Sequence, residues 1–142
     1  MKGFVALFLT LSVVWASSQD ANDIMPVIRH YAAKDCRIAV SKIDVTVDAV
    51  RIDGNYVGFS GVYTTVEGLK DPDIYCEAAL MLCLHKTDGR WKIVFDLSGG
   101  DVPSDEEMRQ IVKDFPTDFP LKLLSSFWQK KFAEARHRKT SR

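Results

Sequence analysis

Four ionisable or nucleophilic side chains lie close together in the sequence, namely Cys83, His85, Lys92 and Asp96. A histidine beside an aspartate can act as a general acid and base, and a thiol beside a histidine can act as a nucleophile. Together with Met81, the group can instead belong to a sheet face that is exposed to solvent or covered by a helix. The sequence leaves both interpretations open.

A second group of candidates is mostly aromatic. His30 and Tyr31 stand near the end of the first segment with helical periodicity, and Tyr63 stands in a strand-like segment. Such side chains can line a ligand pocket. For His30 and Tyr31 the alternative is a helix end that meets solvent.

Motifs for metals and cofactors are absent from the sequence. The three histidines, His30, His85 and His137, fall in different predicted elements, and there is no C-x-x-C or H-x-x-x-H spacing. Phosphate-binding and dinucleotide-binding glycine motifs and the G-x-S-x-G nucleophile motif are also missing. We therefore expect neither a metal nor a cofactor.

The elements that must position these side chains begin with a helix over about residues 20–34. Pro26 is tolerable in its first turn. The capping candidates are Asp20, Asn22 and Asp23, and the apolar stripe is Ile24, Val27, Ile28 and Tyr31.

Four segments with the alternation of β-strands follow, over residues 38–54, 56–68, 74–86 and 90–98. In the first strand the apolar phase slips near Asp48-Ala49, which predicts a β-bulge. In the second strand, Gly58 and Gly61 indicate strong curvature or a close backbone approach.

Asp88-Gly89 predicts a two-residue type I′ turn between the last two strands. In that register the core face pairs Leu84 with Ile93, Leu82 with Phe95, and Leu80 with Leu97. The opposite face pairs His85 with Lys92, Cys83 with Val94, and Met81 with Asp96. The reactive group is therefore expected on the outer face, although a longer turn with a bulge would shift the register.

The C-terminal part of the chain reads as two helices. Ser104 and Glu107 form a capping box for a helix to about Asp114. A last helix, capped by Thr117 or Asp118, carries Leu121, Leu124, Trp128 and Phe132 on one stripe. The whole pattern predicts an α+β fold, with an N-terminal helix packed on a curved four-stranded antiparallel meander, followed by two C-terminal helices.

The strand order pairs two of the three cysteines. In a meander the first and third strands start at the same end of the sheet. Cys36 precedes the first strand and Cys76 lies near the start of the third, whereas Cys83 is roughly 23 Å farther along an extended strand. We predict a Cys36–Cys76 disulfide and a free Cys83.

Residues 1–18 have the basic start, short apolar run and small residues of a secretory signal, with an uncleaved anchor as the alternative. We expect an exported protein, periplasmic or secreted, with one domain over 20–135 and a disordered basic tail over 136–142. The acidic body offers no basic face, so we expect no nucleic-acid partner. We expect no transmembrane span once the signal is removed.

The order of the helix and long strands, with the hairpin KTDGRWKIV at 86–94, resembles the NTF2-like and cystatin-like superfamily of small α+β cone domains. The resemblance covers about residues 22–98 and leaves 101–128 as an addition. It implies a cone with a pocket between the helix and the concave sheet. Members include isomerases, dehydratases, polyketide cyclases, secretion-system scaffolds and domains without activity. The enzymes typically use an Asp–His or Tyr–Asp set inside the cone, which we do not match residue by residue.

We expect a non-catalytic binding or protein-interaction module. Its apolar pocket or its outer sheet face would bind a small apolar ligand or a protein partner, and a second copy of the chain in a homodimer is included. The inward positions of the last two strands are nearly all apolar, which favours binding. The alternative is a small cofactor-free enzyme of the same superfamily, an isomerase, lyase or hydrolase. A structural subunit of an envelope assembly is a third hypothesis.

Overall fold

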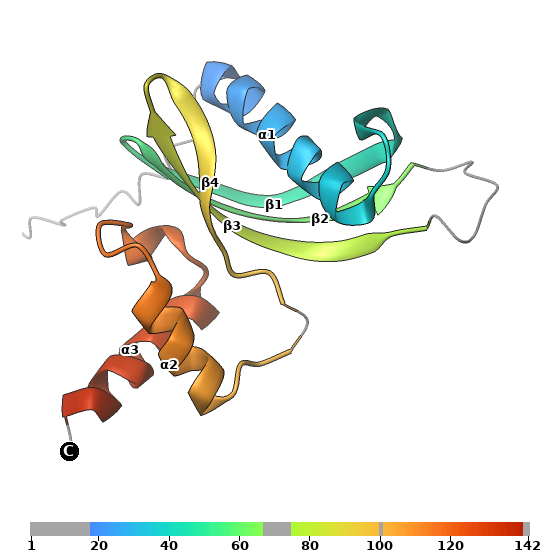
Figure 1. The fold of residues 1–142 in the computed structure, drawn as a ribbon. Helices are drawn as coiled ribbons and strands as arrows, with labels where there is room; N and C mark the ends of the chain where they lie inside the picture. The colour runs from blue at the N-terminus through green and yellow to red at the C-terminus, as the bar shows by residue number, and fades with distance from the viewer. Residues whose placement is uncertain (1–17, 67–74, 100, 141–142) are drawn as a thin grey trace, which may run out of the picture.

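The computed structural model describes residues 18–66, 75–99 and 101–140 (Figure 1). The expected signal segment lies outside the described residues except for Ser18. The elements are α1 (Ser18–Cys36), η1 (Val40–Lys42), β1 (Ile43–Asp53), β2 (Tyr56–Thr65), β3 (Glu77–Thr87), β4 (Arg90–Asp96), α2 (Asp105–Asp114), η3 (Leu121–Leu123) and α3 (Ser126–Thr140). This order confirms the predicted α+β fold.

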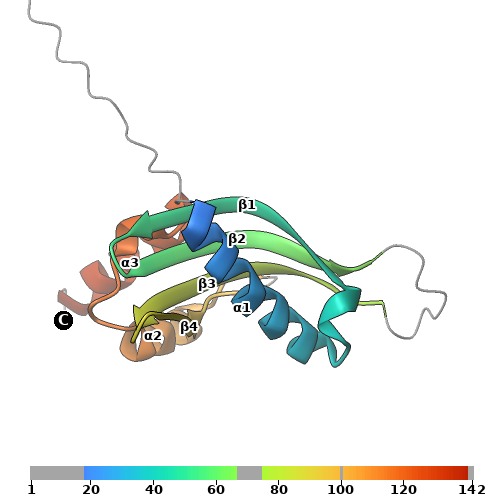
Figure 2. The same cartoon turned by 90° about the horizontal axis from the view of Figure 1, so that it is seen from above.

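The four strands form one antiparallel sheet in the order β1-β2-β3-β4. The sheet curves beneath α1, which crosses one of its faces (Figure 2). Helices α2 and α3 lie on the opposite face, at one end of the sheet (Figure 1). None of the helices in the described ranges is long and apolar enough to cross a membrane.

The predicted bulge in β1 is present. The pairing of β1 with β2 shifts between Val47 and Ala49, which leaves Asp48 as the extra residue. Beyond the bulge, Val50 and Ile52 pack against the core beneath α1. The slip of apolar phase in the sequence is therefore the change of side-chain direction that a bulge produces.

The hairpin of β3 and β4 follows the prediction only near its turn. Asp88 and Gly89 have φ values of 52° and 72°, as a type I′ turn requires. The predicted pairs Leu84–Ile93 and His85–Lys92 are confirmed.

A second bulge, at Val94, changes the rest of the hairpin. It shifts the pairing so that Cys83 faces Phe95 and Leu82 faces Asp96. The predicted pairs Leu82–Phe95, Cys83–Val94 and Met81–Asp96 are wrong. The predicted core pair Leu80–Leu97 is wrong as well, because Leu80 lies in the core beneath α1 and Leu97 lies among the residues packed by the C-terminal helices. The bulge lets Phe95 pack with the C-terminal helices, where its ring is removed from water.

The sheet separates two hydrophobic cores. The first lies between the sheet and α1 and includes Ile24, Ile28, Val57, Phe59, Tyr63, Leu80, Leu82, Leu84 and Trp91. The second lies between the opposite face and the C-terminal segment and includes Met81, Cys83, Leu97, Met108, Phe115, Phe119, Leu123, Leu124 and Phe132. The sheet is thus buried on both faces where the C-terminal segment covers it.

The helix boundaries differ from the predicted ones. Helix α1 begins at Ser18, so Pro26 lies inside it rather than in its first turn. The capping box of α2 is confirmed, because Ser104 and Glu107 bond each other's backbone N–H groups. Residues 121–123 form a 3₁₀ turn and α3 begins only at Ser126. Helix α3 continues to Thr140, so residues 136–140 are helical rather than a tail.

The cysteines are arranged as predicted. Cys36 and Cys76 form a disulfide with Cα atoms 6.0 Å apart, which joins the end of α1 to the start of β3. Cys83 is a free thiol buried in the second core.

Candidate functional site

The reactive group on β3 and β4 does not assemble into a site. Cys83 is fully buried beneath the C-terminal helices. This burial, and secondarily the charge of Asp96, raises the pKa of the Cys83 thiol to about 12, so the thiol stays protonated at neutral pH. The His85 ring stacks on Tyr56 with centroids 4.4 Å apart, while Lys92 is exposed.

The outer sheet face that was expected to bind a partner is occupied by the chain itself. Met81 and Cys83 are both buried in the second core, and Val94 is exposed at the bulge. Asp96 was predicted on this outer face, but its side chain lies on the α1 side of the sheet, where it accepts a hydrogen bond from Tyr31. Of the two interpretations of this face, the helix-covered one holds for Met81 and Cys83.

Two tyrosine–aspartate pairs form on the α1 side of the sheet. The hydroxyl of Tyr31 on α1 donates to Asp96 at the end of β4. The hydroxyl of Tyr63 on β2 donates to Asp35 on α1, with 2.6 Å between the oxygens. Tyr31 and Asp35 are four residues apart on the helix and therefore share one of its faces.

Both phenols of these pairs are held protonated. Burial, followed by the hydrogen bond to Asp35, raises the pKa of Tyr63 to about 12. Burial, followed by the hydrogen bond to Asp96, raises the pKa of Tyr31 even further. Each carboxylate also raises the pKa of the other pair's tyrosine. The pairs therefore offer hydrogen-bond donors beside two acceptors.

His30 does not join these pairs. Its side chain is exposed, and its Nδ1 lies 3.0 Å from the carbonyl oxygen of Pro26 one turn earlier in α1. Of the three pocket candidates from the sequence, the structure therefore brings Tyr31 and Tyr63 into one electrostatic group and leaves His30 outside it.

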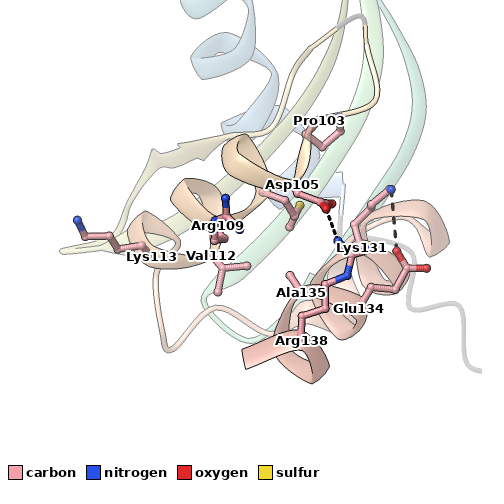
Figure 3. A pocket seen from close by; sticks show the side chains of 10 residues that line it. Pro103, Asp105, Arg109, Val112, Lys113, Lys131, Glu134, Ala135 and Arg138 are labelled. Carbon is pink, nitrogen blue, oxygen red and sulfur yellow. Dashed lines mark ion pairs between the residues drawn. The ribbon is translucent and has the colours of Figure 1, made fainter. Parts of the chain in front are cut away.

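A groove of about 720 Å³ runs between α2 and α3 (Figure 3). This volume lies in the range of small-molecule sites. Its lining is Pro103, Asp105, Met108, Arg109, Val112, Lys113, Lys131, Glu134, Ala135 and Arg138. Each helix contributes residues at three- and four-residue spacing, which is one side of a helix. The groove is thus the seam between two facing helical stripes.

The groove has apolar side chains along the seam and charged side chains around them. Met108 and Val112 of α2 and Ala135 of α3 are the apolar residues of the two helices that line it. Asp105 and Arg138 form an ion pair across the groove, with 2.5 Å between Oδ2 and the nearer guanidinium nitrogen. The hydrogen bond from Arg138 lowers the pKa of Asp105.

The groove has no signature in the sequence that marks it as a site. The periodic set from Asp105 to Lys113 and the set from Lys131 to Arg138 were visible in the sequence. What the sequence does not state is that these two stripes face each other. Each stripe mixes charged and apolar residues, as the exposed side of any surface helix does.

The described part of the chain contains no cluster of three or more His, Cys, Asp or Glu side chains suited to a metal ion. Comparisons with protein-family models, curated proteins and solved structures found no match.

Proposed function

We propose that this chain is an exported, non-catalytic binding domain whose ligand is a small, largely apolar molecule in the groove between α2 and α3. The observation that carries this proposal is the groove itself, with its volume of about 720 Å³ and its three apolar helical side chains. Pockets of this size are typical of small-molecule sites.

The proposed relation to the NTF2-like and cystatin-like domains fits this assignment. The α1 helix and the curved meander form the part that resembles the superfamily, while the groove belongs to the C-terminal addition. In this proposal the cone is the scaffold and the added helices supply the binding site. The Cys36–Cys76 disulfide supports export, because disulfides persist in oxidising compartments.

Native mass spectrometry tests the proposal on protein purified from an exporting host without reductant. We expect a monomer that carries a small-molecule mass. Val112→Trp would fill the groove and abolish the added mass. Val102→Trp is the matched control, because Val102 is 65% exposed and does not line the groove. A bare dimer for the unchanged chain would contradict the proposal and favour an interaction module.

The second candidate is a cofactor-free enzyme that uses the tyrosine–aspartate pairs for acid–base chemistry. The observation that favours it is the placement of Tyr31, Tyr63, Asp35 and Asp96 on the α1 side of the sheet. The two candidates are separated by NMR with the captured ligand. Shifts of the Val112 methyl signals support the groove, whereas shifts of the Tyr31 and Tyr63 ring signals alone would support the enzyme.

A further inference from the structure

We propose that the groove ligand is a single-chain amphiphile with an anionic head group. Its chain would lie along Met108, Val112 and Ala135, and its head would pair with Arg109 and Lys113. This inference rests on the proposed function for the location of the ligand. It adds the chemical class, which the apolar residues alone do not define.

The charge of the lining favours an anion. Four cations (Arg109, Lys113, Lys131, Arg138) and two carboxylates (Asp105, Glu134) line the groove, which leaves an excess of two positive charges. Both carboxylates are already engaged by cations of the lining, Asp105 by Arg138 and Glu134 by Lys131 (Figure 3). The remaining cations of the groove are Arg109 and Lys113.

Arg109 and Lys113 lie about one helical turn apart on α2. They are four residues apart, so their side chains leave the helix on the same face. Arg109 forms an ion pair with Glu106, which does not line the groove, and the two side chains are 64% and 80% exposed. Exposed pairs of this kind contribute little stability, so a ligand carboxylate can replace Glu106. Together, a guanidinium and an ammonium are well suited to a carboxylate or sulfate head.

The apolar part of the groove suits an alkyl chain better than a partner protein. A stable protein interface buries about 800 Å² on each partner around a hydrophobic centre. Here the apolar surface that the two helices contribute is small. Met108 is buried, with only 5% of its surface exposed, and Val112 and Ala135 are partly buried. One alkyl chain can cover a strip of this kind, whereas the anchors of an amphipathic helix need a wider one.

The test compares two probes with the same chain length and different heads, laurate and dodecanol, by isothermal titration calorimetry with monomeric probe. We expect laurate to bind roughly tenfold more tightly, as charge-assisted hydrogen bonds provide. Arg109→Gln with Lys113→Gln should bring laurate affinity down to that of dodecanol and leave dodecanol affinity unchanged. Added salt should weaken laurate binding, because both cations are exposed.

The matched control is Arg90→Gln with Lys92→Gln. It removes the same two charges from the exposed positions of β4, outside the groove, and should leave both affinities unchanged. All four substituted positions are exposed, and thermal melting checks that each variant folds.

Three results would overturn the inference. Equal affinity for laurate and dodecanol, both lost in Val112→Trp, would reject the anionic head and leave the groove as a binding site. Failure of both probes to bind would reject the amphiphile, while a small-molecule mass retained in the native mass spectrum and lost in Val112→Trp would keep the groove as a binding site for another ligand. Binding to phosphatidylglycerol vesicles without binding of monomeric laurate would assign the cations to a lipid surface instead.

Discussion

Single residues in this protein take their chemical character from the faces on which they lie. Tyr63 and Asp35 come from different elements and form a hydrogen bond of 2.6 Å beside the first core. Cys83, which has the most nucleophilic side chain of the group on β3 and β4, lies in the second core with its pKa raised to about 12 by burial. Reactivity is thus suppressed where the sequence suggested it.

The Tyr63–Asp35 bond should make stability sensitive to alkaline pH. The pKa of tyrosine in an unfolded chain is about 10, and it is about 12 in the folded protein. The folded state therefore holds this proton more tightly. The stabilisation is complete below pH 10 and is lost as the pH rises from 10 towards about 12.

Urea unfolding at pH 8 and at pH 11 measures this effect, with Tyr63→Phe as the test variant. We expect the variant to be less stable than the parent at pH 8 and to lose less stability than the parent between the two pH values. Tyr31 remains in both proteins, and its pKa is raised mainly by burial and by Asp96, with Tyr63 the smallest of its causes. Identical losses in parent and variant would show that the Tyr63 proton does not stabilise the fold.

At the scale of elements, the C-terminal segment is held against β2 by close backbone contact. A Cβ atom at Gly58 would lie 2.0 Å from the carbonyl oxygen of Leu123, the last residue of η3. Around this contact, Tyr56 donates a hydrogen bond to Asp118 and Lys122 pairs with Asp53. Glycine at position 58 therefore allows η3 to approach the sheet.

Gly58→Ala should displace η3 and destabilise the protein. Because the clash is with backbone rather than with a flexible side chain, we expect a loss of roughly 1–3 kcal/mol in the free energy of unfolding. Chemical denaturation measures it. Gly99→Ala is the control, since nothing lies within 4 Å of its added Cβ. Equal stability of the two variants would contradict the close packing of η3 on β2.

The disulfide joins two elements that are distant in the chain. Cys36 and Cys76 are separated by 40 residues, and closing a loop of that length stabilises by roughly 4 kcal/mol on the chain-entropy account. We expect Cys36→Ser with Cys76→Ser to lose stability of this order in urea. Adding reductant should then destabilise only the parent. If the variant is as stable as the parent and reductant does not destabilise the parent, the bond does not form in solution.

At the scale of the whole molecule, one sheet serves two cores that bury different sets of side chains. Helix α1 covers one face, and α2 and α3 cover the other at one end (Figure 1). The accessibility of the Cys83 thiol depends on the second core alone, because the thiol lies among the residues that the C-terminal helices bury.

Weakening the second core should expose Cys83 before the rest of the chain unfolds. Phe132→Ala removes a buried ring from that core, at a cost of about 3–5 kcal/mol. We expect Ellman's reagent to label Cys83 faster in this variant without denaturant, whereas the parent thiol stays protected. Ile28→Ala weakens only the first core and is the control. Equal labelling rates in the two variants would mean that both cores open together.

The local patterns of the sequence determined much of this fold. The helix periodicity, the Asp88-Gly89 turn, the phase slip at Asp48 and the capping box at Ser104 all appear in the structure. Each depends on residues close together in the chain, where backbone preferences and side-chain spacing act directly. The pairing of Cys36 with Cys76 followed because a meander brings those strand ends together.

The tertiary structure alone decided which face each side chain of β4 takes and where a ligand can lie. The bulge at Val94 turns Phe95 into the second core and Asp96 towards Tyr31. Both faces of this hairpin carry apolar residues, so alternation could not choose between them, and packing against the C-terminal helices did. The groove likewise exists only because α2 and α3 meet, since a stripe on one helix does not specify the element that will face it.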